Sequence, residues 1–373
     1  MKKIISLFVL FSMALTFFHS QVQAAEAPAV SAKSYVLLEA QSGEILAQGA
    51  ADTQMLIAST TKILTGALVL ERLDPEALVE IQQAYTGIEG SSMYLRPGET
   101  LTVGDLVYGL MLASGNDAAV ALAYHTAGGI EEFSALMNEK ARELGMTQSH
   151  FVNPHGLDAE GHFATARDMA ILTAWAMEIE PFAQVVGTRS IQAAGRSLVN
   201  HNKLLWRYPA ATGVKTGFTK SAGRSLVSSA EEEGTRLICV TLSAPDDWND
   251  HQALLDWGFA HYQYHQIVSQ GEEVARVPLI SGQREDVALV AEMDMGFLAG
   301  TEDEIEVILE VPRFAYAAVE AGAKGGRISV AVNGEVLHEG NLVYGESVAQ
   351  DEAIRLGFWE QVRWHWEMAH RQP

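Results

Sequence analysis

The chain has 373 residues, with 47 acidic and 25 basic side chains and a formal net charge of −22. Hydrophobic residues make up 48% of the sequence, which excludes a largely disordered chain and allows a sizeable buried core. The acidic balance argues against nucleic acid as a partner, because phosphate binding needs clustered Lys and Arg. The single cysteine, Cys239, excludes an intrachain disulfide and is predicted to be a small buried side chain.

Residues 1–24 have the pattern of a secretory signal peptide. Lys2 and Lys3 precede an almost wholly apolar run over residues 4–18, and small residues follow it. An uncleaved membrane anchor is the alternative, but the run is short of the ~20 residues that span a bilayer. We expect cleavage after Ala24, with two later alanines as close competitors. The segment predicts an exported protein that works outside the cytoplasm.

Residues 25–267 are predicted to form one α/β (α+β) domain whose sheet is assembled from non-adjacent parts of the chain. Alternating apolar residues predict strands, whereas apolar residues at helical spacing predict helices. The predicted strands lie at 34–48 (as a hairpin), 213–217, 224–230 and 235–243. The predicted helices are centred on 63–70, 107–111 and 120–123, and two more cover 166–179 and 249–260.

The pattern changes after this domain. Residues 268–350 contain short alternating strands separated by Gly-rich turns and are predicted to form a small all-β domain. Residues 351–373 contain an amphipathic helix with three tryptophans, suited to a membrane interface. The alternatives for this helix are packing on the β domain or against a second copy of the chain. Its apolar arc is Ile354, Phe358, Val362 and Trp366, with Trp359 and Ala369 alongside and with Trp364 and Met368 outside it.

Three short motifs occur in order along the first domain. Ser59-Thr60-Thr61-Lys62 opens the first strong helix, Ser114-Gly115-Asn116 lies in a break between two helices, and Lys215-Thr216-Gly217 lies on a strand. Each motif alone is weak evidence of function, since S-x-x-K occurs by chance about once in a chain of this length. Their order and their predicted settings together are much more specific.

A serine hydroxyl needs a base to become a nucleophile, and residues three apart on a helix share a face. Lys62 can therefore reach the Ser59 hydroxyl. Burial and a second cation, Lys215, would lower the pKa of Lys62 and let it act as a general base. Unpaired backbone N–H groups at the start of the helix could donate hydrogen bonds to an oxyanion.

The other motif residues suit binding of a peptide-like ligand. Ser114 would relay a proton to a leaving amine, and Asn116 would bind an amide of the substrate. Lys215 and Thr216 would hold a carboxylate, and Gly217 would let an extended ligand approach the strand edge closely.

The three motifs resemble the signature of serine penicillin-binding proteins and β-lactamases. The closer resemblance is to the D-alanyl-D-alanine carboxypeptidases, the low-molecular-mass penicillin-binding proteins, and it covers about residues 30–265 densely. The matching segments are IASTTK (57–62), YLRPGE (94–99), MLASGNDA (111–118), NPHGL (153–157), HNKLL (201–205) and GVKTGFT (213–219). A further segment, APDDWNDH (244–251), is similar to the variant common in Gram-positive-type relatives.

The resemblance implies a β-lactamase-like catalytic domain with a helical subdomain, which removes the terminal D-alanine from the peptidoglycan stem pentapeptide through an acyl-enzyme on Ser59. It implies that the backbone N–H groups of Ser59 and Phe218 form the oxyanion hole. β-Lactam antibiotics would acylate Ser59, and the C-terminal helix would bind the outer leaflet of the cytoplasmic membrane. Some relatives place a carboxylate-binding arginine after the last strand of this domain, but residues 245–250 contain none, so that role is not carried over.

Two other functions remain open. A β-lactamase of the same fold would need a deacylating glutamate, and none of Glu160, Glu178 and Glu180 is a convincing one. A non-catalytic peptidoglycan-binding envelope protein would not need its six motif side chains intact. No cofactor and no metal are predicted, because His261 and His265 lack the glutamate of a zinc motif and no phosphate loop follows a strand.

Overall fold

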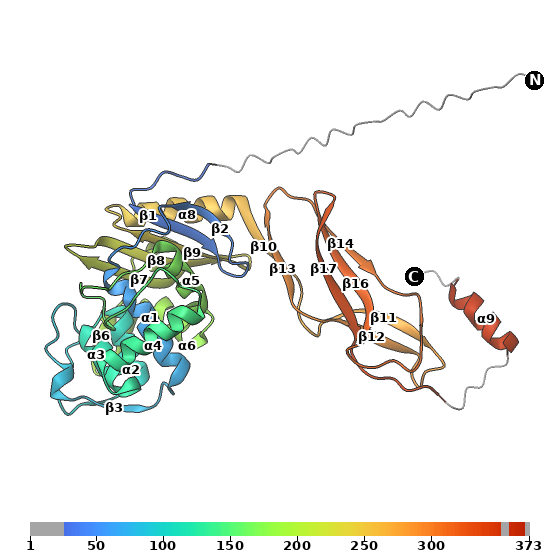
Figure 1. The fold of residues 1–373 in the computed structure, drawn as a ribbon, viewed down its shortest axis with the longest axis horizontal. Helices are drawn as coiled ribbons and strands as arrows, with labels where there is room; N and C mark the ends of the chain where they lie inside the picture. Colours follow the sequence, from blue (N-terminus) through green and yellow to red (C-terminus); the bar gives the residue numbers. More distant parts are fainter. Residues whose placement is uncertain (1–25, 352–357, 370–373) are drawn as a thin grey trace, which may run out of the picture.

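The computed structural model describes residues 26–351 and 358–369 (Figure 1). The predicted signal peptide lies outside these residues. The described chain forms two parts side by side, an α/β part and an elongated β part, and the last helix lies beside the far end of the β part. Within residues 26–351 and 358–369, no helix combines the length and the apolar character needed to cross a membrane.

A five-stranded antiparallel sheet forms the centre of the α/β part, in the spatial order β2-β1-β9-β8-β7. Its strands come from both ends of this part of the chain, as predicted. They are β1 (Ser34–Glu39), β2 (Ile45–Gly49), β7 (Ala211–Thr219), β8 (Gly223–Glu232) and β9 (Thr235–Leu242). Among the described strands β7 pairs only with β8, so its outer edge presents backbone groups with which another extended chain can pair.

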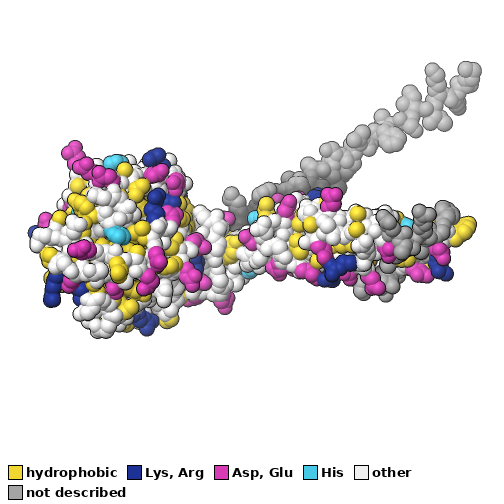
Figure 2. All heavy atoms as spheres, turned by 90° about the horizontal axis from the view of Figure 1, so that it is seen from below, with side chains coloured by type: hydrophobic (Ala, Val, Ile, Leu, Met, Phe, Trp, Pro, Cys, Tyr) yellow, Lys and Arg dark blue, Asp and Glu magenta, His cyan; other side chains and the backbone are white. Residues whose placement is uncertain are grey.

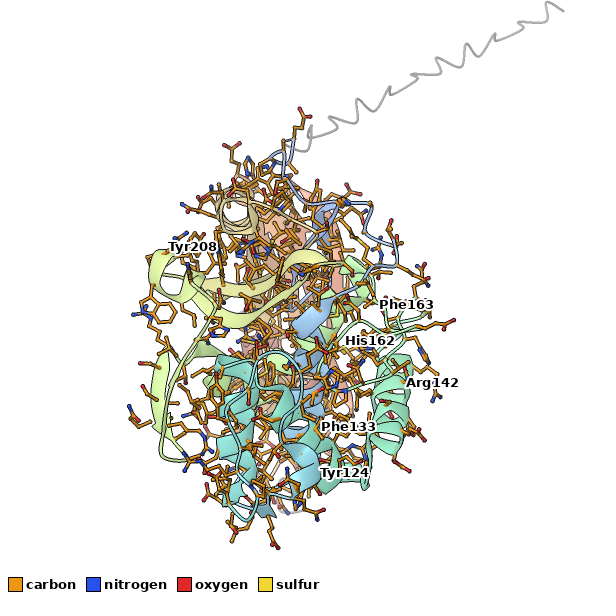
Figure 3. All side chains as sticks on the ribbon, turned by 90° about the vertical axis from the view of Figure 1, so that its left-hand side faces the viewer. Tyr124, Phe133, Arg142, His162, Phe163 and Tyr208 are labelled. Atoms are coloured by element: carbon orange, nitrogen blue, oxygen red, sulfur yellow. The ribbon has the colours of Figure 1, made fainter. Side chains whose placement is uncertain are left out.

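Both faces of the sheet are covered, because successive side chains of a strand point to opposite faces. Val36 and Leu38 join the core beneath the helical layer, whereas Leu37 joins the core beneath α8 (Asp247–His261). The helical layer contains α1 (Lys62–Arg72), α2 (Val103–Leu112), α3 (Asn116–Ala127), α4 (Ile130–Glu143), α5 (Ala166–Met177) and α6 (Glu180–Gly187). In Figure 3, Phe133 of α4 points into this layer and Arg142 of the same helix lies at the outer surface.

Every helix and strand predicted in this part is present, and Cys239 is buried as predicted. The sequence patterns did not indicate α4, α6, the short α7 (Leu204–Arg207) or two small hairpins. The hairpins are β3 (Leu78–Glu80) with β4 (Thr100–Thr102) and β5 (Ser190–Ala193) with β6 (Arg196–Val199). α4 was not predicted because its buried apolar stripe is narrow and most of its other residues are charged or polar.

The β part begins with β10 (Tyr262–Val268), which continues from α8 and pairs with β13 (Met295–Gly300). Its main sheet has six strands in the order β14-β16-β17-β12-β11-β15. They are β11 (Glu273–Ile280), β12 (Asp286–Ala291), β14 (Ile305–Glu310), β15 (Ala315–Tyr316), β16 (Lys324–Val332) and β17 (Glu335–Tyr344). Val277, Leu289 and Leu342 form part of its core. The predicted all-β character is therefore confirmed.

The predicted C-terminal helix is present as α9 (Phe358–Ala369). Trp364 packs edge-on against Phe314, with ring centroids 6.3 Å apart. Trp359 and Trp366 remain 78% and 65% exposed. The side of α9 outside the predicted apolar arc thus contacts the β part, whereas Trp366 of the arc and Trp359 beside it face outward.

Acidic side chains are spread over both parts of the molecule on the face that Figure 2 shows. Several arginines are paired with them, including Arg196 with Glu99 and Arg167 with Asp52. In the described part of the chain, no group of three or more His, Cys, Asp or Glu residues is arranged to hold a metal ion.

Candidate active site

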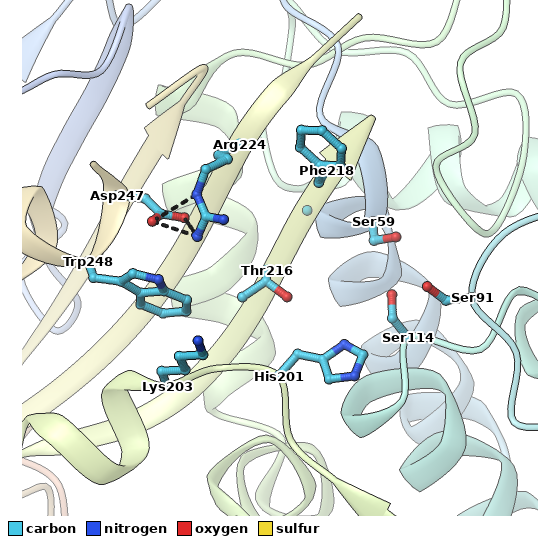
Figure 4. Close-up of a pocket in the computed structure, with 11 residues that line it drawn as sticks. Ser59, Ser91, Ser114, His201, Lys203, Thr216, Phe218, Arg224, Asp247 and Trp248 are labelled. Carbon is cyan, nitrogen blue, oxygen red and sulfur yellow. Dashed lines mark hydrogen bonds and ion pairs between the residues drawn. The ribbon is translucent and has the colours of Figure 1, made fainter. Parts of the chain in front are cut away.

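Ser59 lies on a single 3-10 turn, Ala58–Thr61, that leads directly into α1. Ala58 has a φ of 49°, in a region that non-glycine residues rarely adopt. The Thr61 hydroxyl donates a hydrogen bond to the Ala58 carbonyl at 2.9 Å. Ser59 is half-buried and lines the cavity shown in Figure 4. The prediction that this serine precedes the first strong helix is confirmed.

Two neighbouring groups brace this turn. His162 accepts the Val152 N–H at Nδ1 (3.2 Å), so its proton lies on Nε2 and is donated to the Thr61 hydroxyl (2.9 Å). Burial lowers the pKa of His162 to about 4, so the ring stays neutral. Gly156, with a φ of +86°, packs so closely that an added Cβ would overlap the Ala58 carbonyl oxygen.

Lys62, the first residue of α1, holds its Nζ 3.0 Å from Ser59 Oγ, 2.7 Å from Asn116 Oδ1 and 2.6 Å from the backbone oxygen of His155. A neutral amine has two N–H bonds and one lone pair. The Asn116 and His155 oxygens can only accept, so they take the two N–H bonds. The lone pair is then left to accept the proton of the Ser59 hydroxyl.

The electrostatics favour this neutral form. Lys62 is fully buried, and burial lowers its pKa well below 10.5; the nearby Lys215 ammonium lowers the pKa further, and Asp117 opposes the change. Burial also lowers the pKa of Lys215 to about 7. The lowered pKa of Lys62 favours a neutral amine, which can act as a general base.

The second motif lies in the break between α2 and α3, as predicted. Ser114 has a φ of 58° and lines the cavity. Asn116 begins α3 and is 3% exposed, and its Nδ2 donates to the backbone oxygen of Glu89 at 2.5 Å. Both ends of the Asn116 side chain are thus bound within the protein, where they orient its oxygen toward Lys62.

The third motif lies on β7, as predicted. Lys215 is buried and donates from Nζ to the backbone oxygen of Thr216 at 2.9 Å. A Cβ added at Gly217 would lie 2.9 Å from the Ile57 carbonyl oxygen. Only a glycine therefore lets the strand pass so close to the turn that carries Ser59. The Phe218 side chain is 65% exposed at the cavity.

A cavity of about 350 Å³ lies between the three motifs (Figure 4). Five of the eight predicted site residues line it: Ser59, Ser114, Thr216, Gly217 and Phe218. The other three, Lys62, Asn116 and Lys215, are buried and do not line it. His201, which begins the matching segment at 201–205, also lines the cavity.

Five further residues line the cavity without having been assigned a role from the sequence: Ser91, Lys203, Arg224, Asp247 and Trp248. Arg224 comes from β8, whereas Asp247 and Trp248 begin α8. Asp247 and Trp248 lie in the matching segment at 244–251, and Lys203 lies in the one at 201–205. Arg224 gives no local signal, because only the pairing of β7 with β8 brings it to the cavity.

A half-buried serine beside a buried lysine, at the open edge of an antiparallel sheet, is an arrangement that suits a serine hydrolase with a lysine in place of the usual histidine base. Residues 21–246 match the D-alanyl-D-alanine carboxypeptidase family, and residues 262–350 match the penicillin-binding protein 5 C-terminal domain. The chain belongs to the D-alanyl-D-alanine carboxypeptidase family, and the resemblance found in its sequence is confirmed.

Individual relatives agree over almost the whole chain. The D-alanyl-D-alanine carboxypeptidase DacF of Bacillus subtilis is 31% identical, over 96% of this chain and 96% of its own length. DacC of Escherichia coli is 33% identical, over 91% and 90% of the two chains. The crystal structure of penicillin binding protein 5 from Haemophilus influenzae superposes with a TM-score of 0.71 at 29% identity, covering 87% of this chain and 99% of that one. The protein is accordingly a serine peptidase of this carboxypeptidase class.

Gly156→Ala tests the close contact between Gly156 and the turn that carries Ser59. The new methyl group would overlap the Ala58 carbonyl at a backbone conformation that alanine disfavours, so we expect a loss of about 1–3 kcal/mol in the free energy of unfolding and much slower acylation by penicillin. The matched control is Gly145→Ala, where φ is +77° and no atom lies within 4 Å of the added Cβ. The control should lose stability and keep its acylation rate. Acylation of Gly156→Ala at the wild-type rate would contradict the role of this contact.

Asn116→Asp tests the state of Lys62. A carboxylate 2.7 Å from Nζ would favour the ammonium form, so the pH at which acylation reaches half its maximum should rise by about 1–3 units, with activity recovering in alkaline solution. Asn341→Asp, the same change on β17 of the β part, should leave this pH unchanged. The measurement is the acylation rate against pH. A uniform loss for Asn116→Asp at every pH would contradict the assignment.

Proposed function

We propose that Ser59 is the nucleophile and Lys62 the general base in removing the terminal D-alanine of peptidoglycan stem pentapeptide. The observation that carries the proposal is the 3.0 Å contact between Lys62 Nζ and Ser59 Oγ, with two other acceptors already engaging Lys62. Ser59 Oγ would attack the carbonyl carbon of the penultimate D-alanine while its proton passes to Nζ. The resulting ester would be hydrolysed by water.

The remaining motif residues are proposed to handle the leaving group and the charge. Ser114, whose side chain lines the cavity, would relay a proton to the amine of the departing D-alanine. The backbone N–H groups of Ser59 and Phe218 would form the oxyanion hole, supported by the close passage of β7 beside the nucleophile turn. The contribution of Asn116 to this scheme is to orient Lys62, and its predicted contact with a substrate amide remains a prediction.

The substrate is proposed to bind as an extended chain along β7. The open edge of this strand supports pairing with a peptide backbone. Lys215 and Thr216 would provide positive potential and a hydroxyl for the substrate carboxylate, and Gly217 would let the peptide approach closely. Penicillin carries a strained amide and a carboxylate, so it would acylate Ser59 in the same way.

The penicillin adduct is proposed to be stable, whereas a β-lactamase would hydrolyse it rapidly. Glu160 and Glu178 are exposed, and neither lines the cavity. Glu178 instead forms an ion pair with Arg236. These two carboxylates are therefore poor candidates for activating a deacylating water.

We further propose that the protein is exported and acts on the cell wall from the outer face of the cytoplasmic membrane. The proposed segments are a signal peptide (1–24), a catalytic domain predicted to cover 25–267, a β domain predicted to cover 268–350 and a membrane-associating helix (351–373). β10 (Tyr262–Val268) starts six residues before the predicted start of the β domain and belongs to the β part. The exposed Trp359 and Trp366 of α9 support the last assignment, because the opposite side of the helix packs on the β part.

Ser59→Ala tests the catalytic assignment directly. Intact-mass spectrometry should detect a long-lived penicillin adduct on the wild type and none on the variant. Release of D-alanine from diacetyl-Lys-D-Ala-D-Ala should fall on the order of 10⁶-fold. Ser91→Ala, which removes the hydroxyl of another serine lining the cavity, should still be acylated. If Ser59→Ala still forms the adduct or still releases D-alanine, Ser59 is not the nucleophile.

Removal of the two exposed tryptophans tests the membrane assignment. Each buries a large ring in a membrane interface, so Trp359→Ser/Trp366→Ser should weaken vesicle binding by about tenfold or more per ring, and deletion of 351–373 should abolish it. Trp206→Ser, at an exposed tryptophan of the catalytic part, is the matched control. The readout is co-sedimentation with lipid vesicles. Unchanged partitioning of the deletion variant would refute the anchoring role.

A further inference from the structure

A paired arginine lies on the wall of the cavity opposite the nucleophile. Arg224 Nη2 donates to both carboxylate oxygens of Asp247, at 2.8 and 2.9 Å, and Nε donates to one of them at 3.2 Å. The Asp247 side chain is 2% exposed, whereas that of Arg224 is 43% exposed. Trp248 places its ring centroid 5.8 Å from Arg224 Cζ. The carboxylate and the indole together hold the guanidinium in one orientation.

This pairing leaves part of the guanidinium available to a ligand. Nε and Nη2 are engaged by Asp247, while Nη1 has no hydrogen-bond partner among the described residues. In Figure 4 the third nitrogen of Arg224 is turned away from Asp247 toward the cavity. A guanidinium held on one edge by a buried carboxylate can bind a second anion through its other N–H groups.

The register between β7 and β8 places Arg224 beside the part of β7 along which the substrate is proposed to bind. Arg224 pairs with Phe218 across β7 and β8, and directly paired residues project from the same face of a sheet. Thr216, two residues before Phe218 on the same strand, projects from that face as well. Arg224 and Thr216 both line the cavity, and Ser59 lines it from the other wall.

The charges on the cavity wall point to an anionic ligand. The lining residues include two cations, Arg224 and Lys203, and a single carboxylate, that of Asp247, which Arg224 already pairs. The protein as a whole carries a net charge of −22, so this balance is local rather than a property of the whole surface.

We propose that Arg224, held by Asp247 and Trp248, binds the free carboxylate of the ligand together with the Thr216 hydroxyl. This inference rests on the proposed function, in which that carboxylate belongs to the departing D-alanine or to penicillin. Arg224 thereby fills from β8 the role that residues 245–250 cannot provide. It selects ligands with a carboxylate beside the bond that is cleaved.

The test compares acylation by benzylpenicillin with acylation by its methyl ester, which has no carboxylate. For Arg224→Gln the ratio of the two second-order rate constants should fall about 10- to 100-fold, as expected for loss of a hydrogen bond between charged groups. Because Arg224→Gln leaves a buried carboxylate unpaired, Arg224→Gln/Asp247→Asn is made as well and should give the same fall. Lys220→Gln, on the turn before β8 and outside the cavity lining, controls for a general loss of positive charge.

The possible outcomes distinguish failure of the Arg224 inference from failure of the proposed function. A selective loss with benzylpenicillin in both Arg224 variants supports the inference. An equal loss with acid and ester indicates a purely structural ion pair and overturns it, as does an unchanged ratio. If wild-type protein is acylated by neither compound, the proposed function itself fails, and this result is known before any variant is made.

Discussion

The burial of the Lys62 amine is the constraint on which the rest of the active site depends. An ammonium ion is costly to remove from water, so a fully buried lysine is stable only when it is neutral or well supplied with acceptors. Its hydrogen-bond partners are the neighbouring Ser59 hydroxyl and two acceptors from distant segments, Asn116 Oδ1 and the His155 carbonyl. The turn that carries Ser59, the start of α3 and the loop at 153–157 must therefore pack together to give the buried amine its partners.

The close contacts around the nucleophile follow from that packing. The His155 carbonyl reaches Lys62 only if the next residue, Gly156, lies directly against the Ala58 carbonyl, where no Cβ fits. On the opposite side, β7 can deliver Lys215 and Thr216 only if Gly217 passes the turn at similarly short range. Ala58 itself adopts an unfavourable positive φ. Local strain and precise packing are thus concentrated at the serine, as expected where a structure holds reacting groups in a fixed geometry.

The parts of this arrangement that depend on local sequence could be predicted. The spacing of Ser59 and Lys62, the break at Ser114 and the strand that carries Lys215 follow from periodicity and motif, and all three are confirmed in place. Long-range geometry could not be predicted in this way. A backbone carbonyl such as that of His155 has no residue-type signature, and Arg224 reaches the cavity only through strand register. The side chains of β10 are mostly half-buried, so its sequence carries no strict alternation of apolar and polar residues that would mark it as a strand.

The most direct test of a neutral buried lysine is the pH dependence of wild-type acylation by benzylpenicillin, whose carboxylate stays ionised throughout the neutral and alkaline range. The lowered pKa of Lys62 predicts that the rate constant rises as the amine deprotonates and reaches its plateau well below pH 10.5. A rate that keeps rising steeply up to pH 10.5, as for an ordinary lysine, would contradict the account.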